Sequence, residues 1–295
     1  MTFKEQEQFT KKNSDDLLKE LSNYHGEDII SEIVRLGIQS LMELERDEHI
    51  GVGSYENCRV DGKIIDIACL IAIGIDSEGY RHVLGMDTAW SEIGDSWDRF
   101  IGGLKERRLK GVRLFTSDDH PGIHPAIKKY YPGAVWQRCQ SHFSVNAMDL
   151  FPKSRRDEVY QRLKEVWDCK KYEDAQAKMD QLAEDYQDKY PALSELLSEH
   201  AWEILGVYLV APHEHHKRLR TTNMLERVNQ ELKRRSKVVR IFPNPKSCLR
   251  LFTALLKEWH EDWAYGRKYL NMELLEGFEA GKRVHQQERA PADEK

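Results

Sequence analysis

The sequence predicts an α/β fold in which a mixed sheet is followed by a long all-helical region. Residues 64–75, IIDIACLIAIGI, form a nearly continuous β-branched apolar run, which is typical of a strand buried on both faces. Strand and helix patterns then alternate as far as residue 136, in the order β–β–α–β–α–β that is typical of an α/β layer. Apolar residues at helical spacing dominate residues 153–209, so we expect helices there.

The elements before the helical region are predicted in chain order. Residues 15–50 carry two amphipathic helical patterns, and a glycine-containing break follows at residues 51–54. A short turn at residues 77–79 joins the apolar strand to a second strand over residues 80–86, which predicts a hairpin. The elements expected next are a helix over 90–108, a strand over 112–115, a helix over 121–131 and a strand over 134–136.

Two further helices are predicted after the helical region. The first spans residues 222–237 and carries its leucines and valine on one apolar face. A break rich in proline follows at residues 242–245, and a second amphipathic helix covers residues 247–270. The final residues, GKRVHQQERAPADEK, predict a polar tail without fixed structure.

The composition is that of a charge-rich chain that can fold. Its 295 residues are 40% hydrophobic and 32% charged, and a chain of this length is expected to hold about two domains. The sequence lacks an apolar run of about 18 residues, so we expect no membrane partner, and its polar start predicts no secretory signal. Five cysteines without the spacing of a disulfide framework favour a reduced, cytoplasmic location.

Charge is distributed unevenly along the chain, although the net charge is only −5. Residues 173–203 contain nine acidic and two basic residues, a net of −7, whereas residues 217–240 contain nine basic and two acidic residues, a net of +7. A local basic stripe is what a DNA-binding face needs, because each phosphate contact neutralises a separate charge. A solvated helix face would have the same composition, so charge alone leaves both interpretations open.

Two carboxylates are candidate metal ligands. Asp118 follows a predicted buried strand, and ligand groups in α/β sheets collect at the carboxyl ends of strands. Glu226 lies near the start of the helix over residues 222–237, on its basic polar face. Both positions also have a structural interpretation. Asp118 and Asp119 could be turn or cap residues of the next helix, and Asn223 with Glu226 has the spacing of a capping box.

The segment WQRCQSHF contains Cys139 and His142 in a Cys-x-x-His arrangement. Such a pair is half of a zinc site, and the other half would have to come from His213, His215 or His216. A separation of more than 70 residues resembles no common zinc module. We therefore favour a packed structural motif near the active site over a zinc site.

Together and in order, several segments resemble a known family. They are TSDDHPGIHPAI, PGAVWQRCQSHFSVNA, RTTNMLERVNQELKRRSKVVRIFPN and the hairpin DGKIIDIACLIAIGIDSEGYRHVLGMD. The resemblance is to the Mutator-type bacterial insertion-sequence transposases, and it runs from about Tyr55 to about residue 270. It implies an RNase-H-like catalytic core with an Asp-Asp-Glu triad and two divalent metals, Mg²⁺ or Mn²⁺, which cleaves and joins DNA strands.

The resemblance also implies roles for individual residues. Asp118 matches the second aspartate of the triad and Glu226 the glutamate, so both are expected to be catalytic and to bind metal. Cys139 and His142 match the family's Cys-x-x-His motif, with Arg138 beside it as an accessory residue. We expect a homo-oligomer that binds double-stranded DNA at the terminal inverted repeats and at the target. The residues expected to contact DNA are Arg220, Asn223, Arg227, Lys233, Arg234 and Arg235.

Patterns and resemblance together predict an RNase-H-like mixed sheet that is interrupted by an all-helical insertion, with N- and C-terminal helices. The Glu226 helix would return the chain to the catalytic core after this insertion. The expected divisions are an N-terminal helical segment over 1–54, the first part of the core over 55–150, the insertion over 151–215, the return of the core over 216–270 and the polar tail over 271–295.

The chain departs from the family's pattern at the first aspartate of the triad. That residue is expected three positions before Tyr55, where this sequence has Val52. The upstream segment LMELERDEHIGVGSYE resembles a piece found well ahead of the catalytic domain, so we hypothesise an internal in-frame deletion. Loss of most of the first core strand would leave a sheet edge open.

Nearby acids are weak substitutes for the missing aspartate. Glu56, Asp61 and Asp66 are the candidates, and none is at the matching position. Asp66 lies inside an apolar run, where a buried carboxylate would need a partner or a raised pKa. A catalytically defective DNA-binding remnant is therefore the alternative to an active transposase.

Overall fold

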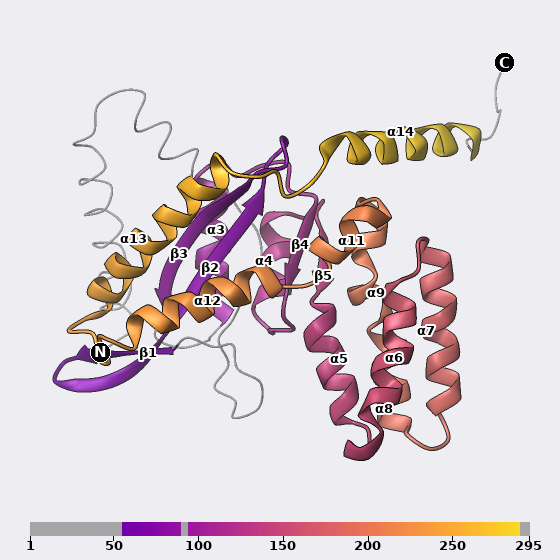
Figure 1. The fold of residues 1–295 in the computed structure, drawn as a ribbon, viewed down its shortest axis with the longest axis horizontal. Helices are drawn as coiled ribbons and strands as arrows, with labels where there is room; N and C mark the ends of the chain where they lie inside the picture. The colour runs from indigo at the N-terminus through magenta and orange to yellow at the C-terminus, as the bar shows by residue number, and fades with distance from the viewer. Residues whose placement is uncertain (1–54, 90–93, 290–295) are drawn as a thin grey trace.

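The computed structural model describes residues 55–89 and 94–289, and Figure 1 shows how their elements are arranged. The helices expected over residues 15–50, the break at 51–54 and the family position at Val52 lie outside the described residues. Within the described ranges, no helix combines the length and the apolar content that crossing a bilayer requires. The described chain is a mixture of helices and strands, so the predicted α/β class is confirmed.

Three antiparallel strands form the first sheet, in the order β1-β2-β3. They are β1 (Tyr55–Val60), β2 (Lys63–Ile75) and β3 (Arg81–Ala89). β1 pairs with the first half of β2 only, as far as Tyr55 opposite Ala68. Asp61 and Gly62 join these strands with φ values of 47° and 79°, and a two-residue hairpin turn of this kind needs a positive φ at both positions. β3 pairs with the second half of β2, which confirms the predicted hairpin.

β2 is buried on both faces because helices cover the sheet from each side. Side chains from Ile67 to Ile73 are at most 2% exposed. The odd-numbered ones pack in one core with α12 (Asn223–Ser236) and α13 (Pro245–Ala264). The even-numbered ones pack in a second core with α3 (Gly94–Glu106) and α4 (Ile123–Tyr130). Period-two alternation therefore divides the strand between two cores, and the predicted doubly buried strand is confirmed.

The second sheet consists of β4 (Leu114–Ser117) and β5 (Val135–Arg138), which run parallel. The sequence predicts one mixed sheet, but in the part of the chain that the structure describes β4 is hydrogen-bonded to β5 and not to β2. The two sheets are joined by side-chain packing instead of backbone hydrogen bonds, because Phe115 of β4 shares a core with Leu70 of β2. A cavity of about 620 Å³, lined by Ile73 of β2 and Leu114 of β4 among others, lies between these strands.

A run of helices follows β5. It comprises α5 (Gln140–Asp149), the 3₁₀ turn η1 (Lys153–Arg155), α6 (Arg156–Trp167), α7 (Tyr172–Tyr186), α8 (Pro191–Glu199), α9 (Ala201–Ile204), α10 (Gly206–Val210) and α11 (His213–Leu219). These helices share a hydrophobic core of their own, which includes Leu163, Met179 and Leu197. Figure 1 shows α6, α7 and α8 as a bundle beside the sheets. The predicted helical character of residues 153–209 is confirmed.

α12 and α13 return the chain to the antiparallel sheet. Figure 1 shows both helices on one side of β2 and β3, and Leu225 and Phe252 pack there against β2. The break between the helices also contacts the sheet. Phe242 N donates a hydrogen bond to Asn57 O, and Arg59 N donates one to Phe242 O. The outer edge of β1 is thereby bonded to the segment that follows α12.

The segment predicted as a polar tail from residue 271 forms a helix instead, α14 (Met272–Arg289). This prediction is wrong because the first half of the segment carries apolar residues at helical spacing and is attached to the rest of the protein. Met272 and Leu275 line the cavity between the two sheets. Glu279 forms an ion pair with Arg113, which lies just before β4.

Candidate functional site

The carboxyl ends of β4 and β5 bring two predicted site residues together. Asp118 directly follows β4, and Cys139 directly follows β5 and precedes α5. The strands are parallel, so their ends meet, and Cys139 N donates a 2.7 Å hydrogen bond to Ser117 O. The helix-cap interpretation of Asp118 and Asp119 is not supported, because the N-cap residue of α4 is Gly122.

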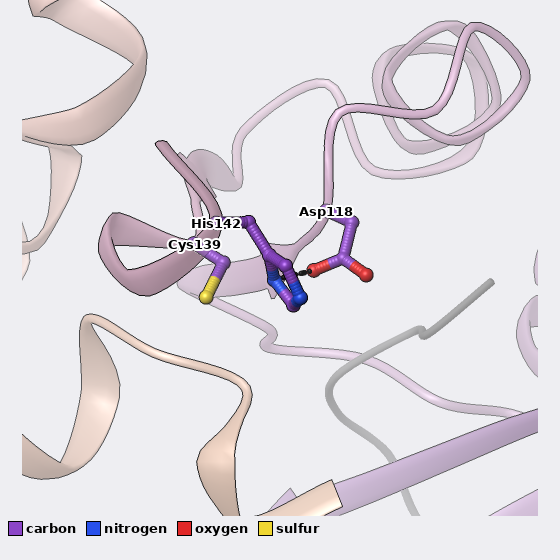
Figure 2. Close-up of side chains that lie close together, drawn as sticks. All are labelled: Asp118, Cys139 and His142. Atoms are coloured by element: carbon purple, nitrogen blue, oxygen red, sulfur yellow. Dashed lines mark ion pairs between the residues drawn. The ribbon is translucent and has the colours of Figure 1, made fainter. Parts of the chain in front are cut away.

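His142 lies between the two candidate carboxylates. Its Nδ1 is 2.7 Å from Asp118 Oδ1, and its Nε2 is 3.9 Å from Glu226 Oε1. Figure 2 shows the imidazole directed at the Asp118 carboxylate, with the Cys139 thiol close to both. Burial lowers the pKa of His142, but contacts with Asp118 and Cys139 outweigh burial and raise that pKa to about 11. The contacts with Asp118 and Cys139 therefore favour the protonated form of the imidazole.

Glu226 reaches this site from the first turn of α12. The helix begins at Asn223, its N-cap residue is Thr222, and no side-chain cap hydrogen bond forms there. The capping box predicted from Asn223 and Glu226 is therefore not formed. The carboxylate of Glu226 instead faces His142. The Glu226 side chain is 22% exposed, and the Asp118 side chain is 21% exposed. The two acids that the sequence singled out thus occupy one partly open site.

Thr222 is a site residue that sequence reasoning missed. It is fully buried, and its Oγ1 lies 3.4 Å from Asp118 Oδ1, 3.5 Å from Glu226 Oε1 and 3.2 Å from Cys139 Sγ. One hydroxyl therefore contacts both carboxylates and the thiol. The signal that could have found it is its place directly before the Glu226 helix, at a position that usually caps with its side chain. Here the hydroxyl is used across the site instead.

The structure brings together a group of possible metal ligands. In the described chain, the cluster with ligand atoms within 4.8 Å of one another is formed by Asp118, Cys139 and His142. His216 is not part of it, because its Nε2 lies 3.0 Å from Ala211 O. The zinc site that would join this motif to the histidines after residue 212 is therefore not formed.

Arg138, the predicted accessory residue, is buried behind the site. Its side chain is 3% exposed, and it pairs with Asp119 Oδ2 at 2.8 Å and with Glu203 Oε2 at 3.1 Å. Asp119 is the neighbour of Asp118, and Glu203 belongs to α9. The guanidinium thus connects the loop after β4 with the helical region.

The predicted DNA-contacting residues fall into two groups. Asn223, Arg227, Arg234 and Arg235 are exposed on α12, and Lys233 is partly exposed beside them. Arg234 and Arg235 are both paired with Glu231, at 2.7 Å and 3.0 Å. Arg220 is turned toward the helical region, where it donates a hydrogen bond to Trp167 O. Contact with DNA stays a prediction for all six.

The acids considered as substitutes for the missing aspartate lie in different places. Glu56 is 7% exposed and accepts a 3.0 Å hydrogen bond from Ser236 Oγ, at the last residue of α12. Ten residues separate Ser236 from Glu226, which corresponds to about 15 Å of helix. Asp61 is exposed in the turn between β1 and β2, and Asp66 is only half-buried on β2. The apolar run around Asp66 therefore does not bury its carboxylate completely.

Comparison with known proteins decides the family. The sequence matches the family described as Transposase, Mutator family, over residues 53–266. The chain belongs to this family. The match includes Asp118, Cys139, His142 and Glu226, so the whole candidate site lies within the Mutator transposase domain.

Curated relatives of this Mutator-family chain are similar over the same region. It is 42% identical over 221 residues to the transposase for insertion sequence element ISRM5 of Rhizobium meliloti. This match covers 75% of this chain and 55% of that protein. It is 41% identical over 218 residues to the transposase for IS406 of Burkholderia multivorans, covering 74% and 56%. A transposase for IS256 in transposon Tn4001 of Staphylococcus aureus is 36% identical over 222 residues, covering 74% and 56%. The chain spans about half the length of these relatives.

Proposed function

We propose that this chain acts as a transposase of an insertion sequence, which cleaves and joins DNA strands with the help of a divalent cation. The observation that carries the proposal is the convergence of Asp118 and Glu226 on His142 and Thr222. The relatives' names, each a transposase for an insertion sequence element, support the same activity.

The residues at the site fit one Mg²⁺ or Mn²⁺ ion. Hard cations of this kind take oxygen ligands, and Asp118 and Glu226 offer carboxylate oxygens from two elements. The site favours positive charge, because its contacts with Asp118 and Cys139 raise the pKa of His142. Asp118 makes its contact with His142 through Oδ1, which leaves Oδ2 as a ligand atom. A bound ion would supply Lewis-acid stabilisation of a phosphate's charge.

The proposed reaction is two in-line attacks on phosphodiesters: water first attacks the phosphorus and displaces a 3′-OH, and this 3′-OH then attacks a phosphodiester of the target and displaces a second 3′-OH. Asp118 and Glu226 would hold the cation, while Thr222 orients one oxygen of each carboxylate and His142 fixes Asp118. We assign the fold to the RNase-H-like, Asp-Asp-Glu class. The strand directions support this assignment, because an antiparallel three-stranded sheet beside a parallel pair of strands is what one divided mixed sheet would leave.

A cleavage and strand-transfer assay with Mn²⁺ and terminal inverted-repeat DNA tests the proposal. We expect joined product from the unchanged chain and loss of product in Asp118→Ala and in Glu226→Gln, which keeps the shape of the side chain but removes its charge. Glu258→Gln, an exposed change on α13, is the matched control and should leave the product yield unchanged. Full activity of Glu226→Gln would contradict the assignment of this residue as a ligand.

We propose that the exposed basic face of α12 holds the DNA backbone beside the site. Arg227 is exposed on the helix that carries Glu226, so a phosphate bound there would be held by the element that supplies one of the carboxylates. Arg227→Gln should weaken binding to all sequences and reduce the slope of log affinity against log salt by about 1. Binding measured by gel shift that does not weaken as salt rises would exclude phosphate contact.

A DNA-binding remnant without catalysis is the second candidate function. It is favoured by Val52 at the family position of the first aspartate, and by the distance of Glu56 from Glu226 along α12. An internal deletion would explain that substitution. On this alternative the chain binds inverted-repeat DNA, yields no cleaved product with Mn²⁺, and lowers the activity of an intact transposase when the two are mixed. A homo-oligomer and a cytoplasmic location stay predictions of both candidates.

A further inference from the structure

A buried ionic connection runs from the helical region to the loop that carries Asp118. Arg138 Nη1 contacts Glu203 Oε2, and Arg138 Nη2 contacts Asp119 Oδ2. Arg138 is 3% exposed, and the Glu203 side chain is 11% exposed. The Asp119 side chain is 50% exposed, so only the end of the connection beside the site is open to solvent.

Because the arginine side chain ends in a rigid planar group, its two ion pairs constrain each other's direction. A guanidinium keeps its charge under all ordinary conditions and presents its donors in a rigid fork. With Nη1 on Glu203 and Nη2 on Asp119, the direction of one contact sets the direction of the other. Removing Glu203 would leave a buried cation with a single, half-exposed partner, which is strongly unfavourable.

The helical end of the connection is itself held in place. Glu203 Oε1 lies 3.0 Å from His200 Nδ1. Gln137 and Gln140 each donate a hydrogen bond to Ile204 O, at 2.9 Å and 2.8 Å. α9 therefore cannot shift relative to β5 without breaking several buried contacts, so Glu203 is a fixed support for Arg138.

We infer that Arg138 is a positioning residue for the Asp118 carboxylate, and that Glu203 of the helical region sets its orientation. The inference rests on the proposed function, because Asp118 is the ligand being positioned. One peptide bond joins Asp119 to Asp118, so the Arg138–Asp119 contact restrains the backbone that carries the ligand. The helical region thereby contributes to the metal site without supplying a ligand.

Mn²⁺ binding to the folded full chain, followed by electron paramagnetic resonance, tests the inference. Asp119→Asn removes an exposed carboxylate and leaves the Arg138–Glu203 pair intact, so this variant should fold. We expect its Mn²⁺ affinity to fall about tenfold, the usual size of an effect exerted through a supporting contact. Arg138→Lys should have the same effect, because an ammonium cannot hold both acids in the geometry of the fork. The matched control is Asp149→Asn, another exposed aspartate paired with an arginine, Arg156.

A double variant separates positioning from direct ligation by Asp119. If the three residues act as one connection, the double variant Asp119→Asn with Glu203→Gln should lose no more Mn²⁺ affinity than the single variant that binds Mn²⁺ less tightly. Losses that add would identify Asp119 as an independent ligand and overturn the inference. Wild-type affinity in Asp119→Asn and Arg138→Lys would also overturn it.

Hydrogen exchange of residues 117–122 distinguishes failure of this inference from failure of the proposed function. Exchange reports on the loop whether or not metal binds, so a chain that binds no Mn²⁺ refutes the metal proposal alone. We expect faster exchange of this segment in Asp119→Asn and in Glu203→Gln. Faster exchange confined to α8 and α9, with the loop unchanged, would show that the ion pairs serve only the stability of the helical region.

Discussion

Replacement of Glu56 by glutamine tests whether this acid is a buried structural group or a substitute metal ligand. Burial raises the pKa of Glu56 to about 7, and a hydrogen bond from Ser236 and the charge of Lys233 only partly oppose it. Glutamine keeps an oxygen that can accept the Ser236 hydrogen bond, but it carries no charge at any pH. The substitution therefore removes the cost of burying a carboxylate and little else.

The sign of the effect follows from the raised pKa. The folded state binds the proton of Glu56 more tightly than the unfolded state, whose pKa is 4.5. The stability contributed by Glu56 is thus fully present below pH 4.5, falls as pH rises, and is lost above pH 7. The shift from 4.5 to about 7 is about 2.5 tenfold changes in proton affinity at about 1.4 kcal/mol each, which sets an upper limit of about 3.5 kcal/mol. Local relaxation and water penetration around a buried carboxylate reduce this to about 2 kcal/mol.

Urea unfolding of the unchanged chain and of Glu56→Gln between pH 4.5 and pH 8 measures this difference. We expect equal free energies of unfolding at the acid end, and Glu56→Gln to be more stable by about 2 kcal/mol at pH 8. Glu258→Gln, an exposed control, should show no such trend. A difference that is constant across this range would refute the reasoning. Loss of Mn²⁺ binding in Glu56→Gln would identify Glu56 as a ligand instead.

Three further predictions concern other buried contacts. Thr222→Val should lower the stability by about 1 kcal/mol and weaken Mn²⁺ binding measured by titration, whereas Thr222→Ser should retain both. Gly79→Ala should lower the free energy of unfolding by at least about 1 kcal/mol, because Gly79 has a φ of +92° and a Cβ would overlap Leu270 O. Gly111→Ala, with a φ of +74° but open space, should cost less. Phe252→Ala should cost about 3–5 kcal/mol in urea unfolding, because it empties a fully buried position under the sheet.

The candidate site shows where sequence reasoning was sufficient and where it was not. Asp118 and Glu226 were recognisable because a strand end and a polar helix face are local patterns, and the family resemblance assigned their roles. Thr222 was not recognisable, because its importance lies in contacts to Asp118 and Cys139, 104 and 83 residues away. The pairing of Arg138 with Glu203, 65 residues away, was hidden for the same reason.

The sequence by itself determined the order and type of the elements from β2 to α13, since the periods of apolar residues are properties of neighbouring positions. It also determined the family, through motifs such as the one around Cys139. Only the tertiary structure decided that the strands form two sheets instead of one, that α14 is attached to Arg113 and to the cavity between the sheets, and that Glu56 lies at the far end of α12 from Glu226. These outcomes depend on which distant surfaces pack together, and packing between distant segments leaves no periodic trace in the chain.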